Sequence, residues 1–255
     1  MGPYERRPMI AWASVGRDLV ELLFPHLCPA CGSCDGLDSD GFCTTCRAEL
    51  DDNYGRNYCG RCAGTVGPYA AADGACPACR GWWWPLAGIA RVGSYQGRLR
   101  EVLLAFKYAG RDELGRFFAS RLARELSEAR WFARVEGLVP VPTCWHRRLR
   151  GKPYVATALA RELGLRTGLP SLSLLRRIRG GPSQIGLSRT RRVENVRGAF
   201  RVARGVRLEK AVVCLVDDVT TSGATLIECA RMLKRAGAAE VFAAVACKSG
   251  SLQAA

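Results

Sequence analysis

Four pairs of cysteines, each separated by two residues, constrain the first third of this 255-residue chain more than any other feature. Two thiolates at CxxC spacing can point at one tetrahedral ion, and two such pairs complete a four-sulfur site. Taken in sequence order, the pairs predict two Zn²⁺ sites, and all-cysteine ligation makes both structural. The first site would use Cys28, Cys31, Cys43 and Cys46, and the second Cys59, Cys62, Cys76 and Cys79.

Two alternatives stay open at these cysteines. The stretch "CPACGSC" also permits a Cys31/Cys34 pair, although we favour Cys28/Cys31 because Gly32 relaxes the backbone where amides turn toward the sulfurs. A disulfide framework is the competing interpretation, and it belongs to oxidising compartments. The chain shows neither an export signal nor a run of about 18 apolar residues. We therefore expect a cytoplasmic protein without a membrane span, in which the thiols bind zinc.

From residue 87 onward, strand and helix patterns alternate. Residues 87–95 and 211–216 read as strands, 97–108 and 225–237 as helices, and 240–247 as a further strand. Such alternation implies parallel pairing with helices on both faces of an open, doubly wound α/β sheet. Ligands of that architecture bind at the carboxyl ends of the strands.

One such strand end carries the stretch "AVVCLVDDVTTSGAT" at 211–225. We expect the strand to stop at Asp217 and Asp218, and residues 219–224 to turn into the next helix. Backbone N–H groups in such a turn, together with a helix N-terminus, favour an anion. The absence of a lysine excludes the Walker loop. Two carboxylates beside a phosphate make sense only if they face vicinal hydroxyls or a divalent cation, which describes a ribose 5-phosphate.

Charge is concentrated in one segment of the chain. The net charge is +15, and residues 147–207 hold 16 Lys and Arg against two acidic residues. A solvated basic face is one interpretation. We favour an anionic partner, either a polyphosphate or nucleic acid, because so concentrated an excess repels itself.

Three consecutive tryptophans, Trp82, Trp83 and Trp84, follow the cysteine-rich segment. We expect them to pack between the two parts of the chain. A surface on which nucleic-acid bases stack is the alternative.

The stretch "VVCLVDDVTTSGAT" resembles the phosphoribosyl-pyrophosphate (PRPP) signature of type I phosphoribosyltransferases. With the cysteine pairs, "VPVPTCWHRRLR" at 139–150 and "PSQIGLSRTRRVENVRGAF" at 182–200, the chain is similar to the ComF (ComFC) family of competence-associated proteins. The resemblance implies a double zinc ribbon at 24–84 and a phosphoribosyltransferase domain at 85–250. It also implies a role in the uptake or use of external DNA.

The resemblance further assigns roles to residues, with PRPP and Mg²⁺ as ligands. Asp217 and Asp218, the catalytic pair, would hold the ribose hydroxyls. The 5-phosphate loop would comprise Thr220, Thr221, Ser222, Gly223, Ala224 and Thr225. The pyrophosphate loop would comprise Thr143, Cys144, Trp145, Arg147 and Arg148. A mobile hood would carry Arg189, Arg191, Arg192 and Arg197.

One departure from the family concerns the acceptor. Where members carry Arg-Gly-Phe-Asn-Gln after the basic loop, this chain reads "RGKPYVATALA" from Arg150. Contacts to an acceptor at these positions would therefore differ.

We therefore expect a ComF-type protein that binds PRPP and single-stranded DNA in natural competence. Two alternatives stay open. One is an active phosphoribosyltransferase on a nucleobase or another acceptor, for which the sequence offers no clear general base beyond His146. The other is a PRPP-sensing scaffold whose zinc module docks a helicase-like competence protein.

Overall fold

The computed structural model describes residues 26–54, 57–67, 75–77, 79–109, 111, 113–143, 155–179 and 189–250. The chain has two compact units, Met1–Ala48 and Glu49–Ala255. The expected domain ranges, 24–84 and 85–250, stay a prediction. Within the described ranges, no helix is both long and apolar enough to cross a membrane.

Helices and strands alternate along most of the chain. In chain order they are α2 (Thr44–Asn53), β1 (Gly88–Ser94), α3 (Gly97–Tyr108), α4 (Glu113–Glu128), the 3-10 helix η1 (Phe132–Arg134), β2 (Gly137–Pro140), α6 (Val155–Thr167), β3 (Leu175–Arg177), α7 (Arg189–Val196), β4 (Phe200–Val202), β5 (Val212–Thr220), α8 (Ala224–Arg235) and β6 (Glu240–Lys248).

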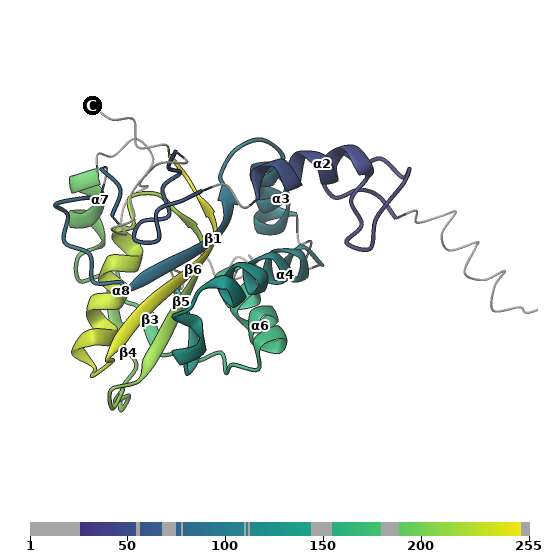
Figure 1. Ribbon diagram of the computed structural model, residues 1–255. Helices are drawn as coiled ribbons and strands as arrows, with labels where there is room; N and C mark the ends of the chain where they lie inside the picture. The colour runs from purple at the N-terminus through teal and green to yellow at the C-terminus, as the bar shows by residue number, and fades with distance from the viewer. Residues whose placement is uncertain are drawn as a thin grey trace, which may run out of the picture. The chain divides into compact units, whose positions relative to one another are not determined.

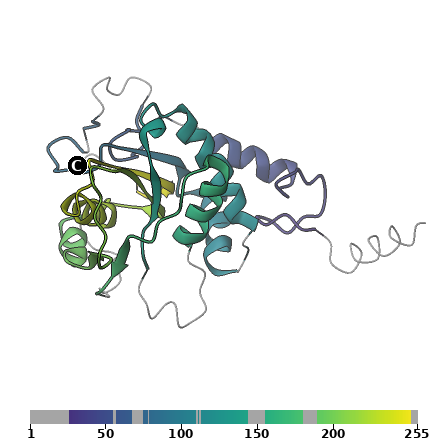
Figure 2. The same ribbon diagram turned by 90° about the horizontal axis from the view of Figure 1, so that it is seen from below.

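Four of the strands form one parallel sheet in the order β1-β6-β5-β2. Helices α3, α4 and α6 cover one face of this sheet and α8 covers the other (Figures 1 and 2). The predicted fold class, an open parallel α/β sheet, is confirmed. All four strands run the same way, so their carboxyl ends lie at one edge, where ligands of such sheets bind.

Burial explains why the predicted elements formed. The central strands β5 and β6 are rich in Val, Ala and Cys, as strands covered by helices on both faces must be. On α8, the buried residues Leu226, Cys229, Ala230 and Leu233 recur at the spacing of one helical face. These residues join the core between α8 and the sheet.

Three features differ from the sequence-based expectation. The strand expected at 211–216 continues to Thr220. An antiparallel ribbon of β3 and β4, and helix α7, were not predicted. Three-residue strands such as "LRR" carry too little alternation to be recognised, and α7 is almost entirely polar. Finally, the Cys43/Cys46 pair lies at the start of α2, a helix that was not predicted.

Candidate functional site

The turn between β5 and α8 depends on a glycine. Gly223 has φ +79°, in the left-handed region that favours glycine, and it directly precedes Ala224, the first residue of α8. A Cβ at this position would lie 2.3 Å from the ring of Trp84, so neighbouring packing excludes a side chain as well. The first N–H groups of a helix have no intrahelical acceptor, so this turn can receive an anion.

The acid pair lies within the sheet and not after it. Val219 and Thr220 pair with Cys247 and Lys248 of β6, so the predicted turn at 219–224 was placed two residues too early. Each aspartate accepts a hydrogen bond from the next backbone amide, Asp217 Oδ1 at 2.9 Å and Asp218 Oδ1 at 2.5 Å. The sheet therefore fixes the backbone that carries both carboxylates.

Lys107, from the last turn of α3, forms an ion pair with Asp218 at 2.9 Å. Burial disfavours the ammonium, yet the Asp218 carboxylate raises the pKa of Lys107 above its ordinary value. Sequence reasoning missed this residue, because no spacing rule joins a helix end to a strand more than a hundred residues away. The ammonium partly neutralises the acid pair next to the turn.

Asp217 is half-buried and behaves differently. Loss of hydration, together with the nearby Asp218 carboxylate, raises the pKa of Asp217 well above its ordinary value. A bound cation or a hydroxyl donor at this edge would stabilise the ionised form.

A second lysine supports the turn from β6. Lys248 is buried, and its Nζ donates hydrogen bonds to the carbonyl of Thr221 and, at 2.9 Å, to that of Ser249. The Ser249 amide donates to Thr220 O at 2.8 Å. The amide of Ala224 donates to Ser222 Oγ at 3.4 Å. These bonds hold the carbonyl groups of the turn and place a positive charge beneath it.

The predicted pyrophosphate loop begins at the same sheet edge. β2 pairs with β5 up to Pro140, and the Val141 amide donates to Val216 O at 2.9 Å. Thr143, which is half-buried, is the last described residue of this segment. Cys144, Trp145, Arg147 and Arg148 lie outside the described residues, as does His146.

The predicted hood is described from Arg189 onward, although the side chain of Arg189 itself is not among the described ones. Arg191 and Arg197 are exposed and Arg192 is partly exposed. Beyond α7 the segment is anchored, because the Gly198 amide donates to the buried Glu228 of α8 at 2.8 Å. The described part of the hood is therefore attached, near its own carboxyl end, to α8.

An arginine pair lies across the β3–β4 ribbon. Arg176 and Arg201 are directly opposite in the antiparallel register, and both are exposed. Like charges opposite each other destabilise a sheet. Arg204 and Arg207, which follow β4, are also exposed. The ribbon is thus a compact basic surface within the segment whose charge the sequence singled out.

The first four cysteines form one cluster. The Sγ atoms of Cys28, Cys31, Cys43 and Cys46 all lie within 4.8 Å of one another. Cys31 and Cys43 are 3.6 Å apart. Cys31 is exposed, while the others are buried. Cys34 is exposed with its Sγ 3.9 Å from Asp35 Oδ1, outside this cluster.

The other four cysteines form a fully buried cluster. The Sγ–Sγ distances are 3.7 Å for Cys59–Cys79, 3.6 Å for Cys62–Cys76 and 3.7 Å for Cys76–Cys79. Hydrogen bonding from the Cys62 thiol, against the opposing effect of burial, lowers the pKa of Cys59 to about 4. The amide of Cys76 also donates to Cys59 Sγ at 3.4 Å. Hydrogen bonds of this kind stabilise a metal-binding thiolate.

Both clusters fit Zn²⁺. Sulfurs on a tetrahedral zinc lie about 3.8 Å apart, because each Zn–S bond is about 2.3 Å long. The observed spacings agree with this value. Four thiolates close the coordination sphere, so both ions would be structural.

The second cluster is fixed to β1. The Ile89 amide donates to Gly60 O at 2.9 Å. Arg91, which is 1% exposed, donates to Ala63 O at 2.8 Å and Thr65 Oγ1 at 3.0 Å, and lies over the ring of Tyr58. The loop that bears Cys59 and Cys62 is therefore bound to the sheet by a buried cation.

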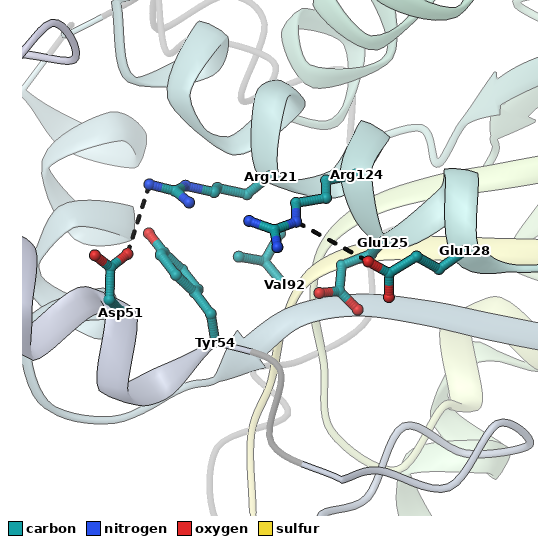
Figure 3. A pocket seen from close by; sticks show the side chains of 7 residues that line it. All are labelled: Asp51, Tyr54, Val92, Arg121, Arg124, Glu125 and Glu128. Atoms are coloured by element: carbon teal, nitrogen blue, oxygen red, sulfur yellow. Dashed lines mark ion pairs between the residues drawn. The ribbon is translucent and has the colours of Figure 1, made fainter.

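A separate pocket of about 400 Å³ lies among α4, β1 and the last turn of α2 (Figure 3). Its charges are largely paired: Arg121 lies 3.5 Å from Asp51, and Arg124 lies 4.0 Å from Glu128. None of its lining residues belongs to the predicted site.

Comparison with known proteins finds matches to two domain families. The double zinc ribbon domain family matches residues 19–81, and the phosphoribosyl transferase domain family matches residues 151–255. Competence protein F of Haemophilus influenzae is 27% identical over 219 residues, 83% of this chain and 93% of that protein. The chain is a homologue of competence protein F. It is also 28% identical to DNA utilization protein YhgH of Escherichia coli K12, over 89% of this chain and 99% of that protein.

The matches with competence protein F and with YhgH each cover most of this chain and nearly all of the relative. This chain joins a double zinc ribbon domain to a phosphoribosyl transferase domain. Among solved structures, a glutamine PRPP amidotransferase from B. subtilis, complexed with ADP and GMP, is 22% identical with a TM-score of 0.33. That match covers 51% of this chain and about a quarter of the amidotransferase, 26%.

Proposed function

We propose that this chain binds PRPP with Mg²⁺ at the carboxyl edge of its sheet and serves DNA uptake or utilization in the cytoplasm. The observation that carries the proposal is a pair of carboxylates, Asp217 and Asp218, that lie six and five residues before a left-handed glycine at a helix start. The helix start could then bind a phosphate, and the two carboxylates at the other end of the segment could bind a diol or a cation. A ribose 5-phosphate requires both.

The resemblance to the ComF family implies the following roles. Asp217 and Asp218 would bind the ribose hydroxyls and hold Mg²⁺ near them, while residues 220–225 would bind the 5-phosphate. Residues 143–148 would face the pyrophosphate, and the arginines at 189–197 would close over it. Lys107 would leave Asp218 or share it when a cation or hydroxyl binds. Magnesium, when bound, would polarise the pyrophosphate leaving group.

Titration calorimetry of the zinc-loaded full chain with PRPP and Mg²⁺ tests this proposal. Wild-type protein should bind saturably, and the variant with Asp217→Asn and Asp218→Asn should lose that binding. A matched control is Asp51→Asn, which removes an acid from the separate pocket and should leave binding unchanged. Saturable binding of equal affinity by the double variant would contradict the proposal.

A second function, binding of single-stranded DNA, is supported by the β3–β4 ribbon. Arg176 and Arg201 repel each other in the free protein, so phosphates between them would relieve that repulsion. The name of one relative, DNA utilization protein YhgH, agrees with this function.

Anisotropy of a labelled oligothymidine, titrated at several salt concentrations, tests DNA binding. Removing two phosphate contacts with Arg176→Ala and Arg201→Ala should reduce the slope of log K against log salt by about 1.4. The matched control, Arg124→Ala with Arg134→Ala, removes the same charge elsewhere on the chain. Equal slopes in the two double variants would mean that the ribbon does not contact DNA.

A further inference from the structure

The three adjacent tryptophans differ sharply in their surroundings. Trp82 is 42% exposed and Trp83 is 64% exposed. Trp84 is partly buried and packs against both the α/β core and the second cysteine cluster. The structure thus gives Trp84 the packing role that the sequence suggested for all three.

One edge of the Trp84 indole lies against the turn between β5 and α8. A Cβ built on Gly223 would lie 2.3 Å from Cη2, 2.9 Å from Cζ3 and 3.3 Å from Cζ2 of that ring. Separations under 3.0 Å essentially never occur for a real Cβ, so the six-membered ring contacts the bare glycine backbone. The ring therefore forms a wall behind the residue whose left-handed conformation starts α8.

The other side of Trp84 reaches the second zinc site. Trp84 packs against the cluster of Cys59, Cys62, Cys76 and Cys79, and only four residues separate it from Cys79 in the chain. That short connection is itself held, because the Trp82 amide donates to Cys79 O at 3.3 Å and Arg61 donates to Trp82 O at 2.6 Å. The position of the indole is consequently set by the metal-binding loops.

We propose that Trp84 is a positioning residue through which the second zinc site holds the Gly223 turn in its anion-binding conformation. Glycine populates many backbone conformations, so a turn built on it needs outside support to stay preorganised. The indole supplies that support, and the four thiolates fix the indole. The proposal rests on the proposed function for the identity of the ligand, but not for the link between zinc, Trp84 and Gly223.

The contacts that make up this link all lie within the unit Glu49–Ala255. Cys28, Cys31, Cys43 and Cys46 belong to the other compact unit, Met1–Ala48. The chain thus offers a matched pair of variants, one in each site. Cys43→Ser and Cys62→Ser each remove one buried ligand and should each lose one zinc ion, counted by metal analysis.

The first test measures binding of ribose 5-phosphate, used as the probe, by calorimetry. Trp84→Ala should raise Kd by about tenfold or more, because the turn loses its preorganised donors. Trp84→Phe keeps a ring behind Gly223 and should stay within about threefold of wild type. Trp83→Ala is the exposed control and should not change Kd. Wild-type affinity in a zinc-loaded Trp84→Ala protein would overturn the proposal.

The second test needs no ligand. In protein labelled with 5-fluorotryptophan, Trp84 and Trp131 give ¹⁹F signals that Trp84→Phe and Trp131→Phe assign. Trp131 stacks on Phe242 of β6 and reports the integrity of the sheet. Cys62→Ser should move the Trp84 signal and the Gly223 amide resonance while leaving the Trp131 signal in place. Cys43→Ser should leave all of them unchanged.

The outcomes separate the two proposals. If wild-type protein binds neither PRPP nor ribose 5-phosphate, the proposed function fails, and the ¹⁹F and Gly223 signals still decide the link. If the second zinc is lost and those signals stay fixed, the link fails whatever the ligand. A shifted Trp131 signal in Cys62→Ser would show that this variant unfolds the whole unit. In that case the Gly223 resonance of the Trp84→Ala variant, which retains zinc, tests the link. An unmoved Gly223 resonance in that variant overturns the link.

Discussion

The two four-cysteine clusters have the same ligands and nearly the same spacing, yet their surroundings differ. The first has an exposed ligand, Cys31, and lies in the small unit Met1–Ala48. The second is buried throughout, bound to β1 through Arg91, and packed against Trp84. Ligand spacing thus defines a metal site, while the residues around the site determine which other parts of the protein depend on the metal.

Arg91 contacts the loop of the second cluster, and Arg47 pairs with acids in the segment between Cys31 and Cys43 of the first. Replacing the two arginines in turn gives the largest expected contrast. Arg91→Met leaves the buried Ala63 carbonyl without its donor and should lower the free energy of unfolding by about 1–3 kcal/mol. Arg47→Met breaks partly exposed ion pairs with Asp38 and Asp40, which contribute about 0–1 kcal/mol each. Urea denaturation followed by tryptophan fluorescence measures both. Equal losses of unfolding free energy in the two variants would contradict this expected difference between the clusters.

Zinc release should separate the clusters kinetically. A thiol reagent reaches the exposed Cys31 directly, whereas the second cluster must open first. Release followed with a colorimetric chelator should therefore show two phases that differ in rate by about tenfold or more. Cys43→Ser should lack the fast phase and Cys62→Ser the slow one. A single phase in wild-type protein would contradict this order.

The smallest expected effect concerns Asp217 on β5. Asp217 has a raised pKa in the folded state, so it contributes stability below the ordinary value of 3.8 and loses it as pH rises through the folded value. Asp217→Asn has no proton to lose, so it should become more stable than wild type as pH increases, by about 1 kcal/mol.

Thermal melts across pH measure this difference in stability, which should correspond to a difference in Tm of roughly 2–4 °C. The two proteins should melt together below pH 3.8. A gap that narrows with rising pH would show that the Asp217 carboxylate is stabilised by its surroundings. Zinc content in the first cluster should be identical in both proteins and serves as the control.

Local patterns in the sequence predicted the sheet, its helices and the two cysteine groupings. The buried run before Asp217 and the helical spacing of Leu226 to Leu233 depend on neighbours a few residues away, so sequence alone reveals them. The extension of β5 to Thr220 could not be seen, because it depends on the length of β6. The roles of Lys107 and Lys248 could not be seen either, because their partners Asp218 and Thr221 are distant in the chain.

Trp84 shows a further limit of prediction. The sequence places it in a run of three equal tryptophans, and no local rule distinguishes one from another. Its contact with Gly223 arises only when the second cluster and α8 are both in place. The resemblance assigned Gly223 to the 5-phosphate loop, and the structure adds a steric reason for a glycine there.

The strand order has a consequence for how the protein is made. β1 lies at one end of the sheet and pairs with β6, the last described strand, so it is synthesised long before its hydrogen-bonding neighbour. Its contacts with Gly60 and Ala63, by contrast, involve residues that have already left the ribosome. A cell short of zinc would then produce chains whose first strand waits unprotected, and their yield of folded protein would depend on metal supply during translation.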